Sequence, residues 1–156
     1  MFRELRRFKQ ALSNEECIKI LDACSTGILA VSGDNNYPYA VPVNYVYKDN
    51  KIFIHCAKTG HKIDAIKKNS NVSFCVVEND DIIEEKFATR YSSIIAFGKA
   101  TLIDDKQEMR NILEFLNEKY SPNYKAEGQK EIDNDIDNVL IIQIEIEHIS
   151  GKRNKE

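Results

Sequence analysis

Several features common in other protein classes are missing from this sequence. No apolar run is long enough for a signal peptide or a membrane span, so we expect a cytoplasmic protein. A surplus of basic charge is missing too: the net charge of −3 argues against a nucleic-acid partner or an anionic membrane surface. The basic side chains gather only near the two ends. We interpret both clusters as solvated termini, with a phosphate role left open for Arg6 and Arg7.

Paired cysteines are also lacking. The four cysteines are widely spaced, and they are Cys17, Cys24, Cys56 and Cys75. Without a Cys-x-x-Cys pair, and in the expected reducing compartment, they are predicted to be reduced and mostly buried thiols. We predict no metal site, because His55, Cys56 and His61 together match no standard zinc spacing.

A bend between a strand and a helix, within residues 53–66, carries the main indication of a site. Thr59 and Gly60 form the bend, and His61 and Lys62 open the helix. A helix start has unpaired backbone N–H groups and a positive dipole end, so a lysine there makes a suitable seat for a phosphate. The Gly-x4-Gly-Lys-Ser/Thr and Gly-x-Gly-x-x-Gly motifs are absent, so such a phosphate belongs to a different architecture. The alternative is a bend that only connects two elements.

The length of 156 residues predicts a single domain, residues 1–156, with tails at 1–12 and 150–156. Helical periodicity, with a capping box at Ser13, and strand alternation predict the elements. The expected helices are 13–25, 60–69 and 105–120, and the expected strands are 26–32, 37–47, 51–56, 72–78, 91–103 and 139–149. The acidic run 78–86 is expected to be a loop, with or without a helical turn. Residues 121–138 are expected to be a loop or weak helix, which either covers a pocket or is a surface excursion.

Two residues within the expected strands point to irregular pairing. Pro42 donates no ladder hydrogen bond, so it indicates an edge strand, a bulge or a place where a ligand replaces a neighbouring strand. Asn44 beside it could offer such a ligand an amide. Gly98 indicates the bend or bulge that a curved barrel needs. The order of elements therefore predicts a mainly β fold with peripheral helices (α+β), in which an antiparallel sheet curls into a small barrel. His148 is expected on the inward face of the last strand.

Five segments in a fixed order resemble a known family. They are Tyr-Ala-Val-Pro-Val-Asn-Tyr at 39–45, Ile-Phe-Ile-His-Cys-Ala at 52–57, Gly-His-Lys at 60–62, Tyr-Ser-Ser-Ile-Ile-Ala-Phe-Gly-Lys-Ala at 91–100 and Ile-Ser-Gly-Lys at 149–152. The chain resembles the pyridoxamine 5'-phosphate oxidase-like FMN-binding split-barrel superfamily, and within it the branch of the nitroimidazole-resistance proteins. The resemblance implies a six-stranded antiparallel split β-barrel that forms a homodimer, with FMN bound in clefts between the subunits.

The resemblance also implies roles for individual residues. The flavin ring would lie along one strand, the ribityl chain along the next, and the phosphate at the helix start, with help from Ser93 on an adjoining strand. The implied cofactor-binding residues are Val41, Pro42, Val43 and Asn44 for the ring, His55, Cys56, Ala57 and Lys58 for the ribityl side, and His61 and Lys62 for the phosphate. No catalytic residue is assigned, although His55 is a candidate.

Two departures from the pyridoxamine phosphate oxidases narrow the expected function. In those oxidases the phosphate-binding pair resembles Arg-Lys, whereas this chain has His61 and Lys62 at that place. Those oxidases also carry an Arg-x-His pattern for their substrate near the C-terminus, and residues 147–152 of this chain lack it. We therefore expect a flavin-dependent oxidoreductase that passes electrons from a nicotinamide donor or a partner protein to a nitroaromatic or quinone. The alternatives are a non-catalytic flavin- or haem-binding barrel, an oxidase like those enzymes, and a deazaflavin-dependent relative.

Overall fold

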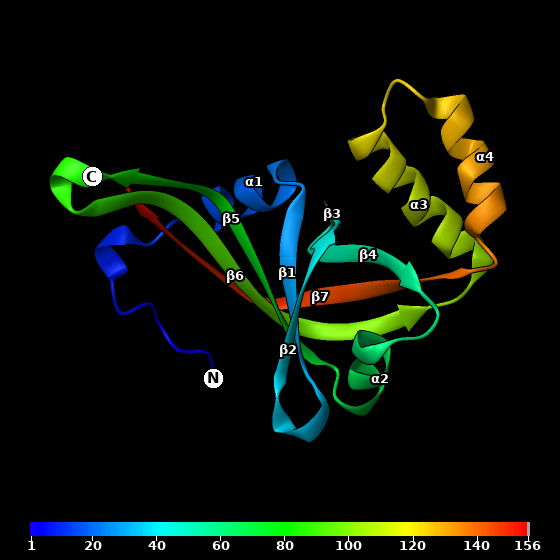
Figure 1. Ribbon diagram of the computed structural model, residues 1–156, viewed down its shortest axis with the longest axis horizontal. Helices are drawn as coiled ribbons and strands as arrows, with labels where there is room; N and C mark the ends of the chain where they lie inside the picture. Colours follow the sequence, from blue (N-terminus) through cyan, green and yellow to red (C-terminus); the bar gives the residue numbers. More distant parts are fainter. Residues whose placement is uncertain (156) are drawn as a thin grey trace.

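Seven strands form one antiparallel sheet in the computed structural model, which describes residues 1–155 (Figure 1). The strands are β1 (Thr26–Ser32), β2 (Pro38–Asn44), β3 (Val46–Lys48), β4 (Lys51–Ala57), β5 (Asn71–Ile83), β6 (Ala88–Ile103) and β7 (Val139–Asn154). Their order across the sheet is β2-β1-β5-β6-β7-β4-β3. The edge strands β2 and β3 are separated in the chain by Tyr45 alone. The sheet therefore curls until its two edges meet in one continuous stretch of chain.

The prediction of a mainly β fold with helices around an antiparallel sheet is confirmed, but the count of six strands is wrong and the sheet is not closed. The predicted strand 37–47 is two strands: β2 pairs with β1 up to Asn44, and β3 pairs with β4 from Val46 onward. Between them, the N–H group and carbonyl oxygen of Tyr45 are bound by the side chain of Tyr120. The sheet thus opens at this residue.

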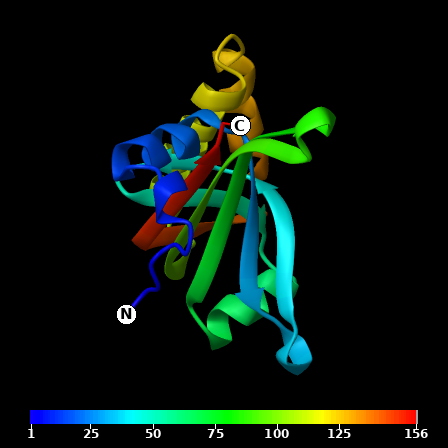
Figure 2. The same cartoon turned by 90° about the vertical axis from the view of Figure 1, so that its left-hand side faces the viewer.

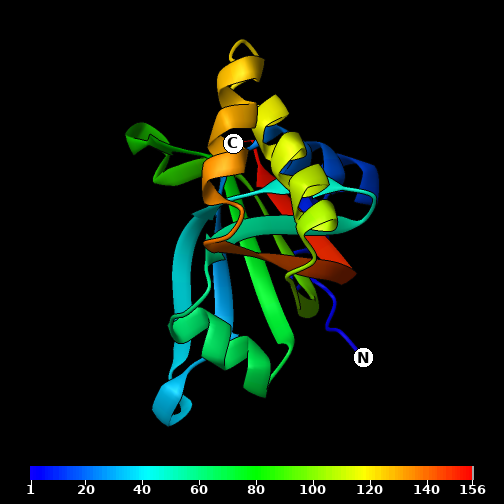
Figure 3. The ribbon, with the colours of Figure 1, turned by 90° about the vertical axis from the view of Figure 1, so that its right-hand side faces the viewer.

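Four α-helices lie around the sheet in the part of the chain that the structure describes. They are α1 (Asn14–Ala23), α2 (His61–Lys68), α3 (Lys106–Tyr120) and α4 (Lys125–Asp135). The predicted capping box is confirmed, since Ser13 Oγ accepts from the N–H of Glu16 and the Glu16 carboxylate accepts from the N–H of Ser13. In Figure 3, α3 and α4 pack side by side, away from α2. Of the two readings of residues 121–138, the helix is the correct one.

Two hydrophobic clusters cover opposite faces of one end of the sheet. Ile141 and Ile142 are adjacent on β7 and are both fully buried, yet they belong to different clusters because successive strand residues point to opposite faces. Ile142 faces the interior of the curled sheet with α1 and α2, and Ile141 packs under α3 and α4. No helix in residues 1–155 is long and apolar enough to cross a membrane.

Strands β5 and β6 extend beyond the body of the sheet as a two-stranded arm (Figures 1 and 2). The predicted loop at 78–86 is wrong, because β5 continues to Ile83 and pairs with β6 as far as Ala88. A short 3-10 helix, η3 (Glu84–Lys86), forms the tip, so the helical turn allowed for this segment is present. The acidic side chains of the run are exposed on this arm, so their polarity reflects solvent on both faces and not the absence of a strand.

A bulge between β6 and β7 confirms the irregularity predicted at Gly98. Phe97 pairs with His148 and Gly98 pairs with Ile146, so β7 has one extra residue, Glu147. The extra residue reverses the alternation beyond it. The predicted inward position of His148 is therefore wrong: His148 lies on the outer face, where its ring stacks on those of Phe2 and Phe97.

Candidate cofactor-binding site

The opening of the sheet at Tyr45 leaves two strand edges without ladder partners. Within residues 1–155, β2 pairs with β1 alone, and β4 beyond Phe53 pairs with β7 alone. The two strands run apart from Tyr45, and α2 lies between their far ends (Figures 1 and 3). We call residues 41–44, residues 54–57 and the first turn of α2 the split. Its strand edges present backbone N–H and C=O groups that a bound molecule can use.

The start of α2 supplies further donors at the split. Gly60 precedes the helix with a φ of 142°, a conformation that glycine adopts far more easily than other residues, and no side chain caps the helix. The first N–H groups of α2 therefore have no intrahelical acceptor. The predicted strand, bend and helix at 53–66 are thus confirmed as elements.

His61 is committed to a structural contact. Its Nε2 accepts a hydrogen bond from the N–H of Asp34 at 3.1 Å and lies 3.7 Å from the Asp34 carboxylate. Its ring also packs on Tyr39, with 4.3 Å between the ring centroids. The imidazole thereby ties α2 to the hairpin between β1 and β2, so an anion at the helix start would meet the His61 backbone and not its Nε2.

Lys62 is the cation at this helix start. It forms no ion pair within residues 1–155, whereas Lys68 at the other end of α2 lies 4.0 Å from Asp34. The Lys62 charge acts on Cys56, but burial is the larger effect and raises the pKa of that thiol. Cys56 Sγ donates to the carbonyl oxygen of Leu140 and points into the core. Only the backbone of Cys56 is therefore available at the split.

The structure brings ten of the eleven predicted residues together around the split. Val41 and Val43 point inward and are half-buried, while Pro42 and Asn44 are exposed. On β4, His55 and Ala57 are exposed, and Lys58 follows directly. Ser93 is the exception. On the β4 side it pairs with Lys152 of β7, far along that strand from residues 139–145, which pair with β4. On the other side, β1 and β5 lie between β2 and its strand β6. Two intervening strands correspond to a separation of about 14 Å.

The end of α3 contacts the residue at which the sheet opens, and no sequence pattern indicated this contact. The Tyr120 hydroxyl accepts from the N–H of Tyr45 at 3.1 Å and lies 2.7 Å from the carbonyl oxygens of both Tyr45 and Ser25. Lys119 Nζ donates to the carbonyl oxygens of Cys24 and Tyr45, and burial lowers the pKa of Lys119. Tyr120 and Lys119 thus replace the ladder partners that Tyr45 lacks.

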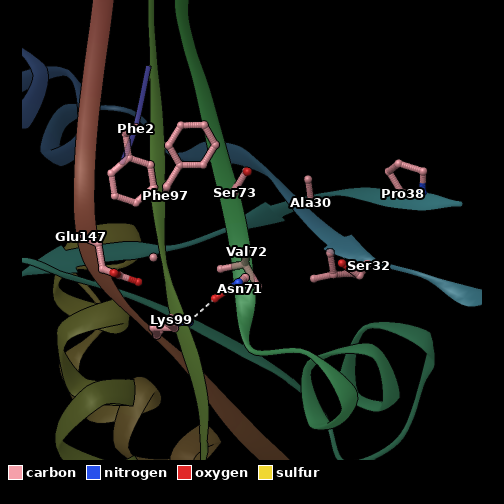
Figure 4. Close-up of a pocket in the computed structure, with 12 residues that line it drawn as sticks. Phe2, Ala30, Ser32, Pro38, Asn71, Val72, Ser73, Phe97, Lys99 and Glu147 are labelled. Carbon is pink, nitrogen blue, oxygen red and sulfur yellow. Dashed lines mark hydrogen bonds between the residues drawn. The ribbon is translucent and has the colours of Figure 1, made fainter. Parts of the chain in front are cut away.

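A separate cavity of about 420 Å³ lies on the outer face of the sheet (Figure 4). Its lining includes none of the eleven predicted residues. The rings of Phe2 and Phe97 stack at one side, and Lys99 donates to the side-chain oxygen of Asn71 at the other. No helix start contributes to this lining, so we place the candidate site at the split.

An antiparallel sheet that opens along one strand, with a helix start at the opening, defines a protein of the split-barrel class. The family model described as pyridoxamine 5'-phosphate oxidase matches residues 13–153. The chain belongs to this family, as its sequence motifs suggested. No curated protein sequence matches it.

Several solved structures share the fold. One, provisionally described as a 5-nitroimidazole antibiotic resistance protein from Bacteroides thetaiotaomicron, has a TM-score of 0.77 at 20% identity and covers 91% of this chain and 86% of its own. An FAD-binding protein from Mesorhizobium loti has a TM-score of 0.67 at 26% identity, covering 94% and 96%. An FAD- and heme-binding protein from Mycobacterium smegmatis has a TM-score of 0.77 at 20% identity, covering 94% and 74%.

Proposed function

We propose that this protein binds a flavin, FMN, at the split and acts as a flavin-dependent oxidoreductase. The observation that carries the proposal is the arrangement of the split: two unpaired strand edges run toward a helix start that has free N–H groups and an unpaired cation, Lys62. A planar ring needs backbone groups at its polar edge, and a phosphate needs a positive helix start. Both requirements are met within one connected stretch of surface.

Each part of the cofactor has a matching part of the split. Residues 41–44 would hold the ring, where Pro42 interrupts the run of N–H donors and Asn44 adds an amide. His55, Ala57, Lys58 and the backbone of Cys56 would contact the ribityl chain. The N–H groups of the first turn of α2 and Lys62 would bind the phosphate.

The family and its members support a flavin as the ligand. Two of the similar structures are named as FAD-binding proteins, and one of these also binds heme. FMN is favoured here because the helix start at the split offers a seat for one terminal phosphate. The flavin, when bound, supplies the electron chemistry, and the chain binds, orients and shields it. The proposed donor is a nicotinamide nucleotide or a partner protein, and the proposed acceptor is a nitroaromatic or quinone.

A homodimer completes this proposal. The outer face of the sheet exposes three large apolar side chains, Ile28, Val77 and Ile95. Ser93 lies on the same face, because it pairs with Val77 and its neighbour Ile94 points into the core. Packing two such faces together would bury the apolar side chains and bring Ser93 of one copy toward the split of the other. This accounts for a predicted cofactor residue that one chain holds away from the split.

Titration of the purified protein with FMN and with FAD, followed by flavin fluorescence, tests the proposal. We expect saturable binding of FMN, tighter than binding of FAD, and a dimer in sedimentation equilibrium. Oxidation of NADH or NADPH in the presence of a nitroaromatic would then establish turnover. Absence of binding by either flavin would overturn the proposal, and a Soret band in the isolated protein would assign haem instead.

A further inference from the structure

The two basic ends of the chain lie together in the folded protein. The N–H of Leu12 donates to the carbonyl oxygen of Gly151 at 2.8 Å, and Ala11 forms a β-bridge with Lys152. The two segments, 1–12 and 150–155, hold seven of the 22 Lys and Arg side chains but only one carboxylate, Glu4. The two basic clusters, expected as solvated termini, therefore form one exposed basic surface.

The N-terminal segment is fixed on both sides of Arg6 and Arg7. Before them, the ring of Phe2 stacks on Phe97 with 5.4 Å between centroids. After them, the short 3-10 helix η1 (Phe8–Gln10) begins, and Gln10 accepts a hydrogen bond from the Tyr91 hydroxyl at 3.3 Å. These contacts hold the segment across the outer face of β6 and β7.

The segment encloses a cavity of about 500 Å³ that is lined by Leu5, Arg6, Arg7, Tyr91 and Lys152. Three of these five residues are cations, and no carboxylate is among them. Lys152 Nζ lies 5.3 Å from the centroid of the Tyr91 ring, so it stays beside the cavity. Asp80 pairs with Tyr91 across the arm but does not line the cavity.

The cations of this cavity also have no internal partners. Within residues 1–155, Arg6, Arg7 and Lys152 form no ion pair. The adjacent Arg153 differs, because it bonds Ser92 Oγ at 2.9 Å and lies within 4 Å of carboxylates of Glu16 and Glu78. Arg153 therefore stabilises the fold, while the other three charges stay available to a ligand.

We propose that Arg6, Arg7 and Lys152 form a binding site for a phosphate-bearing anion. Within one chain this site is separate from the split; because Lys152 pairs with Ser93, it would lie beside the partner's split in the proposed homodimer. Two guanidinium groups can each bind phosphate oxygens in a bidentate manner, and the ammonium group adds a point charge. The cavity has room for two phosphate groups, and Tyr91 offers an aromatic surface to a ligand that carries a base.

Calorimetric titration with inorganic pyrophosphate and with adenosine 5'-diphosphate, on protein saturated with FMN if FMN binds, tests the site. We expect binding of pyrophosphate that weakens with salt, and a loss of about tenfold or more in affinity in the double variant Arg6→Gln/Arg7→Gln. Lys152→Gln should also weaken binding. The matched control, Lys9→Gln, removes the same charge from the same segment outside the cavity and should change the affinity less than about twofold.

The outcomes separate the sources of the phosphate. Equal affinities for the two probes would show that the site recognises phosphate groups alone. Tighter binding of adenosine 5'-diphosphate would show that the site recognises a nucleotide whose base also contacts Tyr91. The proposal would be overturned if neither probe bound at about 1 mM. It would also be overturned if Lys9→Gln lost as much affinity as the double variant, or if Lys62→Gln lost affinity while the double variant did not. Thermal unfolding of each variant checks that the fold is kept.

Discussion

At the scale of single residues, the close approach of the β6 backbone at Gly98 to the β7 backbone decides whether the sheet can bend. A Cβ atom at this position would lie 2.3 Å from the carbonyl oxygen of Glu145 and 2.9 Å from Cγ2 of Ile144. The first of these atoms belongs to the backbone of β7, so relief requires the strand itself to move. The bulge and the close approach therefore depend on the absence of a side chain.

Gly98→Ala is expected to destabilise the protein by about 1–3 kcal/mol, because the added methyl group overpacks the contact with β7. Urea denaturation of the purified variant measures this change. Thr101→Ala, at an exposed position on the same strand, is the control and should cost clearly less. Equal stability of Gly98→Ala and the original protein would show that the bulge adapts without cost.

The four cysteines give a second expectation at this scale. All are free thiols, and burial raises the pKa of each: Cys17, Cys24, Cys56 and Cys75. Because the thiolate is the nucleophile, a raised pKa leaves less reactive thiolate at a given pH. Alkylation by iodoacetamide at about pH 8 should be much slower in the native protein than in urea. If a cysteine were alkylated as fast in the native protein as in urea, its thiol would not be buried in solution.

At the scale of elements, side chains at the end of α3 supply the hydrogen bonds that a neighbouring strand would otherwise make with the backbone of Tyr45. In the variant Tyr120→Phe, the N–H and C=O groups of Tyr45 lose the hydroxyl that binds them. We expect a cost of about 1–3 kcal/mol in unfolding free energy and weaker flavin binding, because the separation of β2 from β4 is no longer fixed. Tyr124→Phe, with a side chain 63% exposed, is the control and should cost less than about 0.5 kcal/mol. A Tyr120→Phe variant with unchanged stability and unchanged flavin affinity would show that the Tyr120 hydroxyl does not hold the sheet open at Tyr45.

The capping box of α1 makes stability depend on pH. Hydrogen bonds from the backbone and side chain of Ser13 lower the pKa of Glu16 below its ordinary value of 4.5, and Arg153 adds to the effect. A lowered folded-state pKa gives stability that is present above the unfolded value and is lost as the pH falls through the folded value. Glu16→Gln should therefore flatten the loss of stability below pH 4.5.

Denaturation midpoints measured at neutral and acidic pH check this expectation. Glu15→Gln is the matched control, because Glu15 makes only an exposed pair with Lys19 on the same helix. It should keep the acid sensitivity of the original protein. An identical pH profile for Glu16→Gln and the original protein would mean that the capping box does not couple stability to pH.

The sequence predicted those elements whose pattern is local. Alternation and helical spacing identified the sheet strands and α1 to α3, and Pro42 correctly indicated an edge. The break at Tyr45 was missed, since the alternation of Val and Tyr continues through it. The arm at 78–91 was missed because a hairpin solvated on both faces has the composition of a loop. Gly98 indicated an irregularity on β6, but the extra residue Glu147 lies on β7 and was missed, because nothing in the sequence of β7 marks it.

At the scale of the whole molecule, the candidate site joins segments that are distant in the chain. The motifs at 39–45, 52–57 and 60–62 meet at the split because the sheet curls back on itself, and their resemblance to the family anticipated this. The partner of Tyr45 at Tyr120 and the meeting of the two basic ends could not be read from the sequence. Each depends on contacts across 75 residues or more, which local periodicity does not contain.

The start of α2 is proposed to hold the flavin phosphate. The affinities of FMN and riboflavin, measured for the original protein and for Lys62→Gln, test this role, with Lys67→Gln on the same helix as control. We predict that the original protein and Lys67→Gln prefer FMN by about 100-fold, and that Lys62→Gln reduces this preference about tenfold while riboflavin binding stays the same. Equal binding of FMN and riboflavin by the original protein would mean that the start of α2 does not hold the phosphate.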